Sequence, residues 1–341
     1  MSARLEIELA EQPEALARLL ERQTATANGI AKLFGRSDVQ YVLIASRGSS
    51  SNAARYAQYL LGRAHRIPVA FATPSLYTLY EQPPRLDGAL VVGISQSGAS
   101  PDVNAVIAEA RRQGRPTVAI TNESESPLAA ASEAVLPLEA GSERAVAATK
   151  TYVNSLGAIA LLFSAATGQG RTELERVPEQ LAAQIERSRA AVEALDLLEG
   201  GTVMARGVNY GTCFEIALKI RELSGLLFEA YSAADLMHGP VAAIGQGWPV
   251  LAVAPTGPTL ASMRAAVNDV ARRGAHMLVL SDDADLLEQA DVPLPLLPGV
   301  PEWLSPLVAV VAGQLAAIRL ARLRGVDVDN PLGLSKVTLT R

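Results

Sequence analysis

The sequence predicts an α/β protein made of two doubly wound, flavodoxin-like parallel-sheet subdomains. Short apolar segments alternate with longer helix-compatible segments along most of the chain, as expected for parallel strands joined by helices. At 341 residues the chain is long enough for two domains, each with its own core. An internal repeat supports this division, because IASRG at residues 44–48 resembles VMARG at residues 203–207. A single domain of seven or more strands is the alternative.

The first half of the chain opens with a predicted helix from Pro13 to about residue 35, which has Leu16, Leu19 and Leu20 on one face. Apolar segments then predict five strands, at residues 41–45, 68–72, 89–94, 117–121 and 133–138. The segments between and after them predict helices at residues 53–62, 101–113 and 145–166.

The glycines of GQG at residues 168–170 mark a boundary, after which a charged helix at residues 172–198 leads into the second half. Strands are predicted there at residues 202–206, 249–254 and 276–281, and helices at residues 212–227, 260–273 and 303–323. The pattern therefore predicts a first domain at residues 1–171, a second domain at residues 172–325 and a C-terminal tail at residues 326–341.

Composition excludes several classes of protein. With 49% apolar and 19% charged residues the chain is globular, and its net charge of −5 without a basic cluster argues against a nucleic-acid partner. A single cysteine, Cys213, and three scattered histidines predict neither disulfides nor a metal site, and no cofactor is expected. The acidic N-terminus does not resemble a signal peptide, and no apolar segment reaches the roughly 20 residues that span a bilayer. We therefore expect a soluble cytoplasmic protein with no membrane partner.

Residues 90–105, LVVGISQSGASPDVNA, combine a buried strand with a polar loop and a helix start. Ser100 is a plausible N-cap, and Pro101 suits the first turn of a helix. Backbone N–H groups, the helix dipole and the hydroxyls of Ser95, Ser97 and Ser100 could together bind a phosphate. The loop lacks the lysine of a P-loop and the spacing of a dinucleotide fingerprint. The pattern thus indicates an anion cradle, and an ordinary hydrophilic loop is the alternative.

Glu215, Lys219 and Glu222 lie on one face of a predicted helix, at positions i, i+4 and i+7. One interpretation is a carboxylate base with a lysine partner at the rim of a cleft. The other is a solvated stripe of ion pairs on the helix surface.

Two further features leave alternatives open. His238, in the segment DLMHGP at residues 235–240, is either a catalytic group in a loop or a hydrogen-bonded loop histidine. The chain end is unusual because Leu334 and Val337 favour burial although the segment has no helical period. This predicts either a tail that folds back onto a site, carrying Lys336, or a frayed tail with an exposed lysine.

Taken together, these features resemble the sugar-isomerase (SIS) family, in particular the isomerase half of glucosamine-6-phosphate synthases and the related aminosugar-phosphate deaminases. The resemblance covers nearly the whole chain. It rests on motifs in the same order: EQP at 11–13, RGSS at 47–50, ISQSG at 94–98, AGSE at 140–143, TK at 149–150, ALKIRE at 217–222, EAY at 229–231, HGP at 238–240 and LSKVT at 334–338.

The resemblance implies a role for individual residues. The residues expected to hold a sugar phosphate are Ser50, Ser95, Gln96, Ser97 and Ser100, with Ser49 close by, and those expected to line the sugar pocket are Val146 and Ala148. Glu222 would move a proton between C2 and C1, assisted by Lys219. His238 would assist ring opening, reaching the site from the second subunit of a homodimer, and Lys336 on the tail would face the carbonyl carbon.

The activity implied is that of an isomerising deaminase without a cofactor, converting glucosamine 6-phosphate to fructose 6-phosphate and ammonia. The single cysteine lies in a predicted helix, so we expect no ammonia from glutamine through a cysteine-dependent glutaminase domain. Alternatives within enzymes are a galactosamine-6-phosphate deaminase, a fructosamine-6-phosphate deglycase or another phosphosugar isomerase. A sugar-phosphate-sensing regulator is the alternative from a different class, but sensing alone would not require Glu222, His238 and Lys336.

Overall fold

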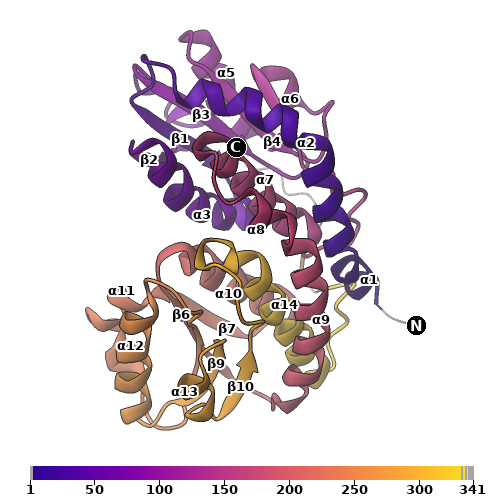
Figure 1. Cartoon of the computed structure of the whole chain (residues 1–341), viewed down its shortest axis with the longest axis vertical. Coiled ribbons are helices and arrows are strands. Elements are labelled where there is room, and N and C mark those ends of the chain that lie inside the picture. The colour runs from indigo at the N-terminus through magenta and orange to yellow at the C-terminus, as the bar shows by residue number, and fades with distance from the viewer. Residues whose placement is uncertain (1–2, 332, 335, 337–341) are drawn as a thin grey trace. The chain divides into compact units, whose positions relative to one another are not determined.

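The computed structural model describes residues 3–331, 333, 334 and 336 (Figure 1). They form two compact units, each taken from several parts of the chain. The N-terminal unit contains residues 14–144, 150–175 and 336, and the C-terminal unit contains the described residues among 3–13, 145–149 and 176–334. Residues 3–13 and 145–149 therefore belong to the C-terminal unit and residue 336 to the N-terminal unit, so a single cut of the sequence does not divide the chain into these units. Domain boundaries at residues 171 and 325 remain a prediction.

The N-terminal unit is built on a five-stranded parallel sheet in the order β2-β1-β3-β4-β5. The strands are β1 (Tyr41–Ser46), β2 (Val69–Phe71), β3 (Ala89–Ile94), β4 (Thr117–Thr121) and β5 (Ala134–Pro137). Every residue of β3 and β4 is buried, which explains why these strands are continuous apolar segments. All five strands predicted from the sequence of this half are present.

The helices of the first half are α2 (Gln12–Phe34), α3 (Gly48–His65), α4 (Ser75–Thr78), α5 (Pro101–Arg112), α6 (Pro127–Ala131), α7 (Lys150–Thr167) and α8 (Arg171–Glu175). The predicted helix at 145–166 begins late, because residues 145–149 pack with the C-terminal unit. The predicted helix at 172–198 is wrong as one element. It is divided into α8, α9 (Val177–Ala191) and a 3₁₀ turn (η1, Val192–Ala194), with Pro178 in the first turn of α9.

The C-terminal unit has a second five-stranded parallel sheet, in the order β10-β9-β8-β6-β7. The strands are β6 (Gly200–Ala205), β7 (Leu227–Ser232), β8 (Pro249–Val253), β9 (His276–Ser281) and β10 (Val292–Pro295). Counted from its own first strand, this sheet has the same order as the other, so the predicted pair of doubly wound sheets is confirmed. The sequence analysis missed β7 and β10, which are the two edge strands.

The remaining helices are α1 (Arg4–Ala10), α10 (Tyr210–Ser224), α11 (Ala233–Met237), α12 (Leu260–Arg272), α13 (Ala284–Glu288) and α14 (Ser305–Leu323), with 3₁₀ turns η2 (Gly207–Asn209), η3 (Pro240–Ala243) and η4 (Glu302–Leu304). Figure 1 shows α11, α12 and α13 on one face of the second sheet, and α9, α10 and α14 on the other.

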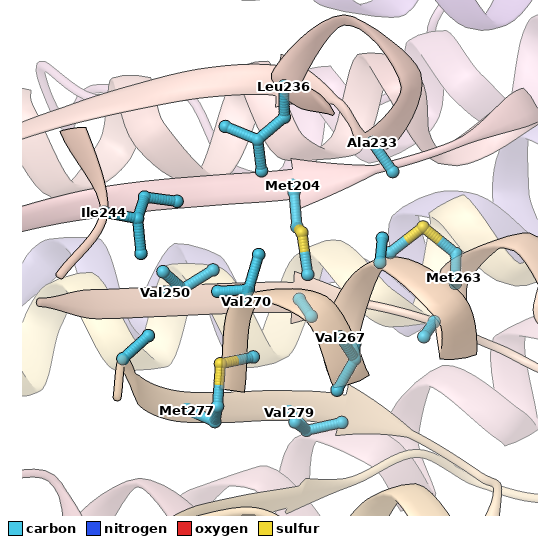
Figure 2. Packing of buried hydrophobic residues seen from close by; sticks show 14 of the residues in the cluster. Met204, Ala233, Leu236, Ile244, Val250, Met263, Val267, Val270, Met277 and Val279 are labelled. Carbon is cyan, nitrogen blue, oxygen red and sulfur yellow. The ribbon is translucent and has the colours of Figure 1, made fainter. Parts of the chain in front are cut away.

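A core of methionine and branched aliphatic side chains joins the second sheet to α12. Met204 on β6, Met277 on β9 and Met263 on α12 meet Val250 and Val267 there (Figure 2). On the other face lies α14, the one helix among the described residues that is long and apolar enough to cross a membrane. Because 94% of the most apolar 18-residue stretch of this helix is buried in the structure, α14 has the character of a core helix.

Candidate active site

The segments predicted to form an anion cradle lie at the carboxyl edge of β1 and β3, which are neighbouring strands with Ser46 opposite Ile94. Helix α3 begins two residues after β1, and α5 begins seven residues after β3. In the order 2-1-3-4-5 this edge is the topological switch point, where doubly wound sheets bind ligands. Two helix N-termini therefore present backbone N–H groups and positive dipole ends at one place.

The loop after β3 is folded by its own serines. Gly98 has φ +59°, and a Cβ at this position would collide with the Ser126 hydroxyl, so only glycine fits. The Gly98 N–H donates to Ser95 Oγ (3.2 Å), and the Ala99 N–H donates to Ser97 Oγ (3.3 Å). Ser100 is the N-cap of α5, as predicted, but its side chain makes no capping hydrogen bond.

The six residues expected to bind phosphate are thus near one sheet edge: Ser49, Ser50, Ser95, Gln96, Ser97 and Ser100. Ser49 and Ser50 lie half-buried in the first turn of α3. Ser95 is buried, whereas Gln96 and Ser97 are half-buried. The Gln96 carbonyl accepts hydrogen bonds from Asn122 N (3.1 Å) and Thr121 Oγ1 (3.3 Å), which fixes the loop against β4.

A polar cavity of about 530 Å³ opens beside the cradle, at the ends of β3, β4 and β5. It is lined by Gln96, Asn122, Glu123, Ser124, Pro137, Glu139, Gly141, Ser142 and Glu143. A volume of this size accommodates a small polar ligand. Gln96 belongs both to the cavity and to the cradle, so one ligand could extend from one to the other.

Lys336 is held by a carboxylate that the sequence analysis did not single out. Its Nζ lies 2.8 Å from Glu143 Oε2, and the Glu143 side chain is fully buried. Glu143 also accepts hydrogen bonds from Thr151 N (3.1 Å) and Thr151 Oγ1 (2.7 Å), so it caps the N-terminus of α7. The frayed-tail alternative is therefore wrong for Lys336. The other tail positions, 332, 335 and 337–341, lie outside the described residues.

Val146 and Ala148, expected in the sugar pocket, lie in an irregular segment of the C-terminal unit. Both are half-buried, whereas their neighbours Ala145 and Ala147 are buried. The backbone N–H of Ala145 donates to both carboxylate oxygens of Glu8 on α1 (3.1 and 3.3 Å). The N-terminal helix, which the sequence analysis did not predict, therefore fixes this segment.

Glu215, Lys219 and Glu222 form a connected group on α10. Lys219 Nζ lies 3.5 Å from Glu215 Oε1 and also forms an ion pair with Glu222 Oε2. The side chains of Glu215, Lys219 and Glu222 are 0%, 1% and 25% exposed. The alternative of a solvated stripe is therefore wrong, because the face that carries Glu215 and Lys219 is buried.

Glu222 is the member of this group that meets open space. It lines a largely apolar cavity of about 420 Å³ in the C-terminal unit, with Leu218, Arg221, Leu223, Ser224, Gly225, Arg324, Val326 and Leu334. A carboxylate at the rim of a cavity, held by a buried lysine, has the arrangement expected of a general base.

His238 ends the short helix α11 and is exposed. Gly239 follows with φ +143°, a conformation that favours glycine, and Pro240 begins η3. Gly239 and Pro240 thus restrict the backbone that follows His238. Among the residues that the structure describes, the imidazole has no recorded hydrogen-bond or ion-pair partner, so the hydrogen-bonded alternative does not hold within this part of the chain. Over the same residues, no group of three His, Cys, Asp or Glu side chains is suited to a metal ion.

The chain matches one protein-family model and several known enzymes. The model of the SIS domain matches residues 37–165 and 202–324. Glutamine–fructose-6-phosphate aminotransferase (isomerizing) of Pyrococcus horikoshii is 33% identical over 340 residues, covering 96% of this chain and 56% of the relative. The enzyme of the same name from Gloeobacter violaceus is 34% identical over 350 residues, covering 96% and 57%. The chain thus spans little more than half the length of these relatives.

Solved structures of other proteins have a similar fold. A suggested phosphosugar isomerase from Silicibacter pomeroyi is 32% identical, with a TM-score of 0.84 over 96% of this chain and 100% of that one. Glucosamine-6-phosphate deaminase from Thermotoga maritima is 23% identical, with a TM-score of 0.81 over 99% and 100%. At that identity the second likeness speaks for the fold alone.

Proposed function

The chain belongs to the SIS domain family, and on that premise we propose that it is a phosphosugar isomerase that deaminates a 6-phosphorylated aminosugar. The substrate we favour is glucosamine 6-phosphate, giving fructose 6-phosphate and ammonia. The observation that carries the proposal is the ion pair between the buried Lys219 and Glu222 at the rim of a cavity. A protein that only binds phosphosugars has no need for a buried lysine that orients a carboxylate.

In this proposal the serine cradle holds the phosphate, the end of the substrate that does not react. Hydroxyls and helix N-terminal N–H groups suit the three oxygens of a phosphoryl group. The residues assigned to this task are Ser49, Ser50, Ser95, Gln96, Ser97 and Ser100, and Val146 and Ala148 are assigned to the sugar pocket.

Glu222 is assigned the proton transfer. It takes the proton from C2 of the open-chain aminosugar and returns it at C1, which converts the aldose into a 2-imine of the ketose. Water adds to C2 of this imine and ammonia leaves, so that glucosamine 6-phosphate and water give fructose 6-phosphate and ammonia. Lys219 holds the carboxylate in place, and Glu215 holds Lys219. Positioned carboxylates commonly contribute proton transfer of this kind.

Two further residues complete the assignment. Lys336 faces the carbonyl carbon, and Glu143 fixes its ammonium group before substrate binds. His238 assists ring opening. Because its imidazole is exposed, we propose that it acts in the site of a second copy of the chain, which makes the active enzyme a homodimer.

An ammonia-release assay tests the proposal. Purified protein is incubated with glucosamine 6-phosphate, galactosamine 6-phosphate and a 6-phosphorylated fructosamine, and ammonia and ketose phosphate are measured separately. We expect equal amounts of ammonia and fructose 6-phosphate from the first substrate. The Glu222→Gln variant should lose turnover but bind fructose 6-phosphate as the wild type does. Phosphosugar binding without isomerisation or ammonia release from any substrate would instead indicate a sensor.

A further inference from the structure

Arg47 lies at the anion cradle but has no role in the assignment above. It is the N-cap residue of α3 and has extended backbone angles, φ −139° and ψ 160°. Its Nε–H donates to Asp102 Oδ2 at 2.6 Å, and Asp102 is the second residue of α5. The side chain of Arg47 thus connects the two helix N-termini at which the phosphate is proposed to bind.

The two partners differ in their exposure. The Asp102 side chain is 1% exposed, and its Oδ1 accepts the backbone N–H of Val103 at 2.9 Å, so the carboxylate is fixed. The Arg47 side chain is 51% exposed. Of the five guanidinium N–H groups, only Nε–H has a recorded partner within the described part of the chain. A cation with its terminal donors accessible, oriented by a buried carboxylate, is suited to bind an oxyanion in a bidentate way.

The C-terminal unit offers an internal comparison. Arg206 follows β6 as Arg47 follows β1, and it too is an N-cap with an extended backbone, φ −147° and ψ 158°. The second residue of α12 is Ala261, however, where α5 has Asp102. The repeated fold therefore supplies the arginine twice but the carboxylate that orients it only once. The Arg47–Asp102 pair is a property of the cradle and not a consequence of the topology.

We propose that Arg47 binds the phosphoryl group of the substrate through its terminal guanidinium nitrogens, and that Asp102 positions it. This inference rests on the proposed function, because it assumes that the cradle holds a phosphate. It adds a cation to a site whose other predicted ligands are hydroxyls, an amide side chain and backbone N–H groups, all of them uncharged. Lysine could restore the charge but could not hold Asp102 and present two parallel donors at once.

Calorimetric binding of fructose 6-phosphate to the full chain tests the proposal. Charged hydrogen bonds of this kind correspond to about a 10- to 100-fold change in affinity. We therefore expect Arg47→Gln to weaken the Kd by at least tenfold and Arg47→Lys by less. The matched control is Arg112→Gln. Arg112 is the last residue of α5, at the opposite end from Asp102, and its Nε donates to Glu109 Oε2 of the same helix at 2.7 Å. This control should bind within twofold of the wild type.

The double variant Arg47→Gln/Asp102→Asn separates direct contact from mere neutralisation of Asp102. If Arg47 contacts the phosphate, the double variant remains at least tenfold weaker than the wild type, although its net charge is unchanged. Recovery to within twofold, or an Arg47→Gln variant that binds as tightly as the wild type, overturns the inference and leaves the proposed function intact. A wild type that binds neither fructose 6-phosphate nor glucosamine 6-phosphate overturns both. Circular dichroism checks that each variant is folded.

Discussion

Replacing Lys219 by methionine is expected to destabilise the C-terminal unit by about 3–5 kcal/mol. The Lys219 side chain is 1% exposed, and that of its partner Glu215 is 0% exposed, with 3.5 Å between Nζ and Oε1. Methionine keeps most of the length and the apolar contacts of lysine, so the cavity it leaves is small. The loss comes instead from the Glu215 carboxylate, which is not exposed to solvent and loses the ammonium group of Lys219.

Tryptophan fluorescence provides a selective assay. Both tryptophans of the chain, Trp248 and Trp303, lie in the C-terminal unit, so their emission during urea denaturation reports the unfolding of that unit. We expect the Lys219→Met variant to show a lower midpoint with an unchanged slope, which would mark a loss of stability rather than a change in the unfolded state. The Glu222→Gln variant is the control, because Lys219 keeps its ion pair with Glu215 there and the Glu222 side chain is 25% exposed, so its loss should cost less than that of Lys219.

The double variant Glu215→Gln/Lys219→Met decides whether buried charge is the cause. Removing both charges is often close to neutral, so this variant should regain most of the stability that the single variant loses. If the double variant is as unstable as Lys219→Met, the loss comes from packing. If Lys219→Met itself loses less than about 1 kcal/mol, the surroundings of Glu215 must be far more polar than its burial implies.

Three further changes test other parts of the molecule. Gly98→Ala should weaken fructose 6-phosphate binding at least tenfold in calorimetry, because φ is +59° at this position and the added Cβ would collide with the Ser126 hydroxyl. An unchanged Kd would contradict the proposal that this loop binds the phosphate. Glu143→Gln should release Lys336, because glutamine has no negative charge and only one accepting oxygen, whereas Glu143 accepts from Thr151 N at Oε1 and from Thr151 Oγ1 and Lys336 Nζ at Oε2. Faster hydrogen exchange in the tail and at least tenfold slower turnover are expected, and unchanged exchange would argue against this anchor. Burial lowers the pKa of His65, so its proton binds more tightly in the unfolded chain. The Tm should therefore fall as the pH drops through about 6.5, and the His65→Phe variant should lose this dependence; a variant that keeps it would show that other groups are responsible.

The sequence predicts best what is local in the chain. Each strand of the first sheet is a short apolar segment, and β3 leads directly into the serines of the cradle, so strand, loop and helix start are read from 16 consecutive residues. The edge strands β7 and β10 escape prediction for physical reasons. β7 follows α10 after only two residues, and β10 reads VPLP, in which two prolines obscure the strand pattern. Both strands are identified only by their pairing in the structure, β7 with β6 and β10 with β9.

Contacts between distant positions could not be predicted. Glu143 and Lys336 are 193 positions apart, and Arg47 and Asp102 are 55 positions apart. The spacing of Glu215 and Lys219 establishes that they share a face of α10, but it cannot establish which element covers that face. Helix α10 packs against α14, whose apolar sequence gives no sign of the two charges in the neighbouring helix. Burial of this charge pair depends on tertiary packing and is invisible to helical periodicity.

The two sheets share one strand order, yet their switch points are chemically different, and this difference decides which unit is suited to hold an anion. At the edge of β6 and β8, the Thr259 hydroxyl donates to Glu302 Oε1 at 2.6 Å, and the Thr256 N–H donates to Asp282 Oδ1 at 2.7 Å. Glu302 also packs closely against Gly257: a Cβ added to Gly257 would lie 2.6 Å from the Cβ of Glu302. The protein's own carboxylates thus occupy donors at this edge, and a phosphate would have to displace them against charge repulsion. At the edge of β1 and β3, the acid Asp102 is instead paired with Arg47, whose side chain is 51% exposed. We therefore expect an anion to bind at the switch point of the N-terminal unit and not at that of the C-terminal unit, although both have the same topology.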